Sequence, residues 1–263
     1  MTTAAVMPQA RNLPRFGGFT LGMIRLELRR MMRNRRTVIF TLIMPAVFVL
    51  LFGTNASSRQ QSVGGGGNVA GYILVSMAVY GAMLAATSGG AMVSIERAAG
   101  WSRQLRLTPL KPIAYVAIKL VLAMTIGAVS VAVAFTVGAL SGAKLPTHAW
   151  IECGLLAWVC ALVFAAFGLF MGYLLPSENV MQILGPVLAV LSFAGGLFVP
   201  VKLLGHTFAT IAKFTPVYGV GEIARYPLTH DGNLWLAALN VVAWTTIFAV
   251  GAMWRFRRDT ARV

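Results

Sequence analysis

Long apolar runs are the feature that most limits what this chain can fold into. A bilayer core about 30 Å thick requires about 20 predominantly apolar residues from each helix that crosses it. Six segments have this character, namely residues 37–54, 69–93, 113–140, 149–175, 180–199 and 234–254. Only 11% of the residues are charged, whereas soluble domains contain roughly 25%. The sequence therefore predicts an all-α integral membrane protein with six transmembrane helices.

The distribution of Lys and Arg predicts how these spans are oriented. The segments before residue 37, between the second and third spans and after residue 254 contain 16 Lys and Arg residues. The segments on the opposite side contain only five. Because cytoplasmic segments are enriched in Lys and Arg, both termini are expected in the cytoplasm. The cations lie in clusters between apolar runs and not on a soluble basic face, so no nucleic-acid partner is expected.

We expect a single membrane domain over residues 1–263, with a cytoplasmic amphipathic segment (1–36), a six-helix bundle (37–254) and a cytoplasmic tail (255–263). Apolar side chains recur at helical spacing before the first span, at Phe16, Phe19, Met23 and Leu26. A basic stripe accompanies them, at Arg25, Arg29, Arg33 and Arg36. This pattern predicts an interfacial helix, whose candidate residues are Arg25, Glu27, Arg29 and Arg33. Anchoring on membrane lipids and docking of a partner protein both remain open.

Two segments are expected on the outer side of the membrane. Residues 57–68 contain four consecutive glycines and are predicted to form a flexible loop. In the longer segment, 200–232, the apolar part 203–214 is too short and too polar to span, which favours re-entrant or interfacial half-helices. A folded loop without a gating role is the alternative. The candidate gate residues are Pro200, Phe214, Pro216 and Tyr218.

Familiar catalytic and metal-binding patterns are absent from the sequence. It contains no GxxxxGK[ST], HExxH or GxSxG stretch, so we expect neither an enzyme nor a metal site. Ion-coupled transporters place ionisable side chains deep in their spans. Here Lys119 lies near the end of the third span and is expected to snorkel to the surface, while Glu152 and Glu178 are expected to anchor at the interface. Uphill transport would therefore require energy from another polypeptide.

The stretch "SIERAAGWSRQLRLTPLKP", residues 94–112, is the polar segment between the second and third spans. It is predicted to form a short docking helix in the cytoplasm. Ser94 can cap the start of this helix, and Glu96 suits its positive N-terminal end. Arg103 and Arg106 suit its negative C-terminal end, and Pro109 then ends it because the residue before a proline avoids helical geometry.

Within this stretch, "ERAAGWSRQLRLTPLKP" resembles the Glu-Arg, glycine, leucine-arginine and Thr-Pro-Leu pattern of ABC-2 permeases, which include the daunorubicin-type drug-resistance permeases. A second stretch, "GGLFVPVKLLGHTFATIAKFTPVYGVGEIAR", resembles the aromatic residue, proline and Thr-Pro-aromatic turn that follow the fifth span in that family. The resemblance implies a six-helix permease that pairs with a second permease subunit. Separate ATPase subunits would bind ATP and Mg, and this chain itself would bind no cofactor.

The resemblance also implies roles for particular residues. The ATPase-coupling residues would be Glu96, Arg97, Gly100, Trp101, Arg103, Leu105, Arg106, Thr108 and Pro109. The substrate path would be lined by Met77, Tyr80, Met83, Phe193 and Phe198. Family members often carry further acidic residues where this chain has Ala98 or Ala99 and Gln104, so its docking surface would be unusually basic.

The function implied is export of amphipathic drugs or natural products across a bacterial plasma membrane. Two alternatives remain open. One is export of a lipid or a lipid-linked glycan, and the other is a membrane scaffold or sensor that responds to a partner ATPase without transport. The bacterial assignment also draws on the abundance of Ala, Gly and Arg, which indicates a GC-rich genome.

Overall fold

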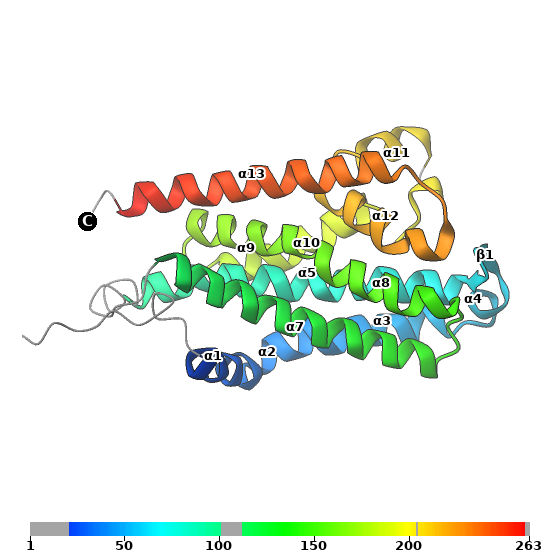
Figure 1. The fold of residues 1–263 in the computed structure, drawn as a ribbon, viewed down its shortest axis with the longest axis horizontal. Coiled ribbons are helices and arrows are strands. Elements are labelled where there is room, and N and C mark those ends of the chain that lie inside the picture. Colours follow the sequence, from blue (N-terminus) through cyan, green and yellow to red (C-terminus); the bar gives the residue numbers. More distant parts are fainter. Residues whose placement is uncertain (1–20, 101–111, 204, 261–263) are drawn as a thin grey trace, which may run out of the picture.

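The computed structural model describes residues 21–100, 112–203 and 205–260. These form an elongated bundle in which most helices run along the long axis (Figure 1). The elements are α1 (Leu21–Arg33), α2 (Arg35–Val38), the π-helical turn η2 (Ile39–Ile43), α3 (Met44–Gly53), α4 (Ala56–Gln60), β1 (Ser62–Gly64), β2 (Gly67–Asn68), α5 (Val69–Ala98), α7 (Pro112–Leu140), α8 (Thr147–Cys160), α9 (Leu162–Leu174), α10 (Val180–Ala194), the 3-10 turn η3 (Val201–Leu203), α11 (His206–Ala212), α12 (Pro216–Thr229) and α13 (Leu234–Thr260).

Among the described residues, four helical segments are long and apolar enough to cross a membrane. They are Val69–Ala98, Val116–Leu140, Thr147–Leu174 and Leu234–Phe256. The first and fifth predicted spans correspond to shorter apolar helices, Ile39–Gly53 and Val180–Ala194. The prediction of a helical, multi-pass membrane protein is therefore confirmed. We call the end of the bundle where α1 and the C-terminal end of α13 lie the α1 end, and the opposite end, where β1 lies, the β1 end (Figure 1).

Helix α5 is the central element of the bundle, and 22 of its 30 residues are buried. It packs mainly against α7 and α9. The contact with α9 depends on glycine, because a Cβ at Gly90 would lie 2.5 Å from the backbone nitrogen of Leu169, and one at Gly168 would collide with the backbone of Thr87. Small residues let helix backbones approach closely in membranes. Two glycines four residues apart are expected by chance in a glycine-rich chain. Gly168 and Gly172 nevertheless both lie in the contact between α9 and α5.

Pro45 is expected to disturb the first span, and the structure shows how this is accommodated. A proline cannot donate to the carbonyl four residues earlier, which here belongs to Thr41. The backbone widens into the π-helical turn Ile39–Ile43 just before Pro45, which takes up a position in the first turn of α3. The hydroxyl of Ser130 on α7 donates to the Thr41 carbonyl oxygen at 2.5 Å. A neighbouring helix therefore supplies a donor to the carbonyl that Pro45 itself cannot serve.

The segment predicted to be a flexible loop at residues 57–68 is ordered, which corrects the expectation. It contains α4 and an antiparallel β1–β2 hairpin whose turn uses positive φ angles at Gly65 and Gly66. Asn68 then caps α5, since its Oδ1 accepts from the amides of Gly71 and Lys144, both at 2.9 Å. Its Nδ2 donates to the carbonyls of Arg59 and Gly142. This buried amide side chain thus ties the hairpin to α4, to the start of α5 and to the loop after α7.

The close approach of α5 and α9 gives a stability prediction. Gly90→Ala should lower the free energy of unfolding by about 1 to 3 kcal/mol, because the added methyl group meets backbone that cannot move alone. Gly185→Ala is the matched control, since a Cβ there has no neighbour within 4 Å and alanine favours a helix over glycine by about 1 kcal/mol. Denaturation of the purified protein in detergent measures both. Equal stability of the two variants would contradict the close helix contact.

Candidate functional site

The polar stretch at residues 94–112 begins inside α5 and not in a separate helix. Helix α5 continues to Ala98, and Gly100 follows with a φ of +72°. Ser94 does not cap a new helix, which corrects the prediction. Its hydroxyl donates to the carbonyl of Leu175, just beyond α9, at 2.9 Å. The helix can continue through these polar residues because each finds a partner in the bundle.

Arg97 also points towards the end of α9. Its Nη1 donates to the carbonyl oxygens of Gly172 and Tyr173, at 3.5 and 3.4 Å, and its guanidinium lies 5.4 Å from the centre of the Tyr173 ring. The last carbonyls of a helix have no partner within the helix, and a cation placed there is favourable. Ser94 and Arg97 together therefore fasten the end of α5 to the end of α9.

The other predicted coupling residues lie outside the described residues. They are Trp101, Arg103, Leu105, Arg106, Thr108 and Pro109. The predicted helix between Ser94 and Pro109 is untested beyond Gly100 and stays a prediction. The chain is described again from α7, which begins at Pro112 beside the end of α5.

Glu96 is buried, and its partner is a residue that the sequence prediction assigned to the membrane surface. Glu96 and Lys119 are only 3% and 4% exposed, and the Lys119 Nζ lies 2.5 Å from Glu96 Oε1. The same Nζ lies 3.1 Å from Oε2 of Glu27, which is also buried. Lys119 therefore does not snorkel outward. Two carboxylates hold it inside the protein, and they offset the cost of removing its charge from water.

Arg30 completes this charged group, which we call the α1 ion cluster (Glu27, Arg30, Glu96 and Lys119). Its Nη1 lies 3.8 Å from Glu27 Oε1 and 3.7 Å from Glu96 Oε1. Its side chain remains 55% exposed. The cluster joins three elements that are distant in sequence, because Glu27 and Arg30 lie on α1, Glu96 on α5 and Lys119 on α7.

Helix α1 rests on the bundle through a narrow apolar contact. Ile24 and Leu28 pack against a small group of buried side chains, made up of Ala85, Ile118, Leu122 and Ile126. The predicted basic residues Arg25, Arg29 and Arg33 are all exposed. Leu26, part of the predicted apolar stripe, is 70% exposed and does not face the bundle. The face that packs carries Ile24, Glu27 and Leu28, of which the sequence analysis named only Glu27.

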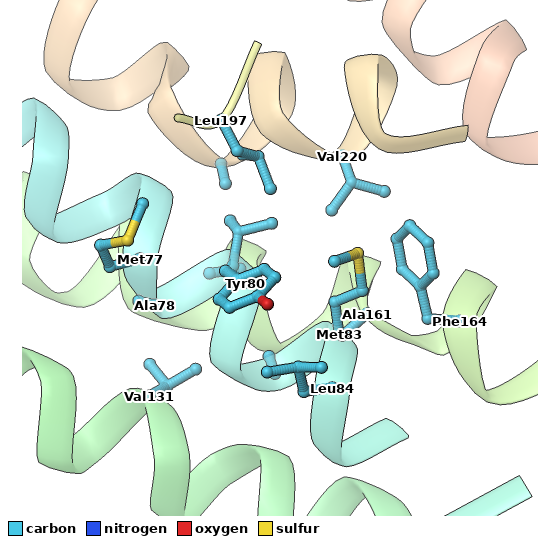
Figure 2. Packing of buried hydrophobic residues seen from close by; sticks show 14 of the residues in the cluster. Met77, Ala78, Tyr80, Met83, Leu84, Val131, Ala161, Phe164, Leu197 and Val220 are labelled. Atoms are coloured by element: carbon cyan, nitrogen blue, oxygen red, sulfur yellow. The ribbon is translucent and has the colours of Figure 1, made fainter. Parts of the chain in front are cut away.

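Three candidate substrate-path residues lie on α5 inside the protein. Met77, Tyr80 and Met83 are buried and point into the core between α5 and its neighbours (Figure 2). The Tyr80 ring lies 5.0 Å from that of Phe198. Phe193 on α10 is largely exposed. Three of the five residues are thus buried, Phe198 is half-buried and Phe193 is exposed, and the path itself stays a prediction.

Of the candidate gate residues, Phe214, Pro216 and Tyr218 lie at the start of α12, and Pro200 directly precedes η3. Pro216 and Tyr218 are buried, Pro200 is half-buried and Phe214 is exposed. The turn before α12 is held by α13, where the side-chain amide of Asn240 donates to the carbonyls of Lys213 and Thr215. Two short helices, α11 and α12, do occur in the predicted external segment.

Arg225 on α12 is a buried charge that sequence reasoning placed in an external loop. Only 2% of it is exposed, and its guanidinium donates to Ser76 Oγ, the Gly196 carbonyl and Glu222 Oε1. It therefore ties α12 to α5 and to the turn after α10. The sequence feature that could have indicated this buried charge is the spacing of Glu222 and Arg225, an acid and a base three residues apart on one helix. In the part of the chain that the structure describes, no three His, Cys, Asp or Glu side chains are grouped to hold a metal ion.

The α1 ion cluster gives a second stability prediction. Lys119→Ala should lower the free energy of unfolding by about 3 to 5 kcal/mol, because it removes the cation that lies nearest to both buried carboxylates, Glu27 and Glu96. Lys144→Ala removes an exposed lysine at the other end of α7 and should be nearly neutral. Denaturation of both variants in detergent measures the difference. A Lys119→Ala variant as stable as the control would show that the cluster contributes nothing to stability.

Comparison with known proteins tests the family resemblance seen in the sequence. Over 242 residues the chain is 28% identical to YvfS of Bacillus subtilis (strain 168), which carries the name of a transport permease. The aligned region covers 89% of this chain and 96% of that protein. Residues 20–228, from the start of α1 to the end of α12, match the family described as ABC-2 type transporter. The chain therefore belongs to the ABC-2 type transporter family.

Proposed function

We propose that this chain is the permease subunit of an ATP-driven exporter whose ATPase is a separate polypeptide. The observation that carries the proposal is the concentration of basic residues and of the α1 ion cluster at one end of the bundle, next to the segment 101–111. The sequence contains no nucleotide-binding loop of its own. The ATPase would bind ATP and Mg, and its closure would act on α1 and on the stretch from Glu96 to Pro109.

We infer a topology of six crossings with both termini in the cytoplasm. The segment from α2 through α3 contains 19 residues, which corresponds to a length of about 28 Å, close to the bilayer core. Helix α10 is shorter, with 15 residues, and would cross together with the turn that follows it. Helices α11 and α12 would then be half-helices capping the outer end. The excess of Lys and Arg at the α1 end supports this orientation in a bacterial plasma membrane.

The proposed cargo is an amphipathic drug or natural product. The proposal is supported by a group of aromatic side chains, Phe48, Phe52, Tyr80 and Phe198. Phe48 contacts the other three rings and Tyr80 contacts Phe198, with ring centres 5.0 to 6.3 Å apart. The group extends from the buried Tyr80 to Phe52, which is 52% exposed. Aromatic side chains bury large apolar areas and stack on flat ligands. A second permease subunit, identical or related, would close the path. Met77, Met83 and Phe193 would also line the path when the helices separate.

Co-purification with candidate ATPases tests the proposed function. The complex should form and hydrolyse ATP faster when an amphipathic drug is added. Stimulation by a lipid or lipid-linked glycan alone would point instead to the first alternative cargo. A complex without any stimulated transport would point to a scaffold or sensor, and failure to bind an ATPase would contradict all three functions.

The docking surface can be tested with paired substitutions. Arg103→Ala with Arg106→Ala should weaken binding of the ATPase about five- to thirtyfold, because two charged contacts of roughly 0.5 to 1 kcal/mol each are lost. The matched control removes two cations at the β1 end, with Arg59→Ala and Lys213→Ala, and should leave binding unchanged. Titration of the ATPase onto immobilised permease measures both. Equal affinities in the two variants would place the docking surface elsewhere.

A further inference from the structure

Two exposed tryptophans lie at the two ends of the apolar part of α13. Trp235 and Trp254 are 88% and 51% exposed, and they lie 19 positions apart on one continuous helix. At 1.5 Å per residue this separation is about 28 Å, close to the thickness of the bilayer core. Tryptophan is enriched at both membrane–water interfaces. The lipid headgroups are therefore expected at the level of Trp235 at the β1 end and of Trp254 at the α1 end (Figure 1).

The side of α13 between the two tryptophans is suited to contact with lipid. Helix α13 packs against α9 and α12 and lies along one edge of the bundle (Figure 1). It is the least buried of the four long apolar helices. The exposed apolar side chains between the tryptophans include Leu239, Val242, Ile247, Val250 and Met253. Because the tryptophan spacing matches the bilayer thickness, hydrocarbon chains are the neighbours that this surface fits.

The two ends of this apolar surface differ in charge. The guanidinium carbon of Arg258 lies 4.1 Å from the centre of the Trp254 ring, and that of Arg255 lies 6.0 Å from it. Neither Lys nor Arg occurs between residues 226 and 254, and the charged residue nearest to Trp235 in the sequence is Asp231. Cations are therefore grouped around Trp254 and not around Trp235.

The two arginines are available to an anionic ligand. Among the residues that the structure describes, the ion pairs involve neither Arg255 nor Arg258. A guanidinium whose face rests on an aromatic ring keeps its N–H groups at the edge, where they can donate to oxygen atoms. Arg255 is half-buried, and its Nε has no hydrogen-bond partner within the described residues. A nearby oxyanion would offset part of the cost of that unpaired, charged donor group.

We propose that Trp254, Arg255 and Arg258, which we call the α13 lipid site, bind the phosphate group of an anionic phospholipid in the leaflet at the α1 end. Arg258 donates to the phosphate while the Trp254 ring holds it in place, and Arg255 adds a second positive charge. The acyl chains lie along the exposed apolar side of α13. Lipid is favoured over the ATPase as occupant because the site lies at the headgroup level and continues into an apolar surface. The site requires only that α13 spans the membrane, so it does not depend on the proposed export.

Native mass spectrometry of the permease alone, titrated in detergent with phosphatidylglycerol or phosphatidylcholine, tests the site. We expect the wild type to bind phosphatidylglycerol more tightly, since the choline group carries a positive charge. Arg255→Gln with Arg258→Gln should weaken binding of phosphatidylglycerol about five- to thirtyfold and leave binding of phosphatidylcholine unchanged. The matched control removes two exposed cations at the β1 end, with Lys144→Gln and Lys213→Gln, and should change neither affinity.

A second pair of variants tests the role of the ring. Trp254→Ala should weaken binding of phosphatidylglycerol roughly two- to fivefold, because Arg258 loses the ring that positions it. Trp235→Ala removes the same side chain at the other end of the apolar surface and should leave the affinity unchanged. Equal effects of the two substitutions would show that Trp254 acts only as a general interfacial anchor and not as part of a lipid site.

Several outcomes would overturn the α13 lipid site. One is equal affinity of the wild type and the double arginine variant for phosphatidylglycerol. Another is displacement of the lipid by millimolar inorganic phosphate, which would assign the arginines to a free anion. Weaker ATPase binding with unchanged lipid binding would assign the surface to the ATPase. If the double variant does not fold because Arg255 is half-buried, the exposed Arg258→Gln decides alone, and an unchanged affinity contradicts the proposal.

Discussion

The burial of Lys119 between Glu27 and Glu96 is the interaction on which the α1 end depends. A charge removed from water is tolerated only where opposite charges and hydrogen bonds replace the water. Lys119 meets this condition because α1, α5 and α7 each place a side chain at the same point. The arrangement in turn fixes where α1 rests and keeps the end of α5 helical as far as Ala98. Ser94 and Arg97, from the same turn, fasten α5 to the end of α9.

The rest of the bundle is organised around α5 by close backbone approach. Glycines at the crossing of α5 and α9 leave no room for a side chain. At the crossing with α3, Pro45 packs near Gly81, and Ser130 donates to the Thr41 carbonyl, which Pro45 cannot serve. At the β1 end, Asn68 and Arg225 are enclosed by several polar partners each. In a membrane these contacts matter because lipid offers no alternative hydrogen-bond partner.

The helices at the two ends of the molecule are therefore held in place by different kinds of contact. At the β1 end, α12 and the turn after α10 are joined to α5 by a buried arginine whose partners lie on several sides. At the α1 end, α1 rests on the bundle through the α1 ion cluster and through Ile24 and Leu28.

The sequence by itself determined the features that depend on neighbouring residues. Run length and composition predicted the helical membrane fold, and Pro45 marked the disturbed first span, because bilayer thickness and backbone chemistry act locally. Only the tertiary structure decided which charges are buried. Glu27 and Lys119 are 92 residues apart, so nothing near Lys119 indicates the carboxylates that hold it inside, and snorkelling was the natural prediction. The same holds for Arg225 and for the Gly168 contact, since the desolvation of a charge and the space beside a glycine are set by helices distant in sequence.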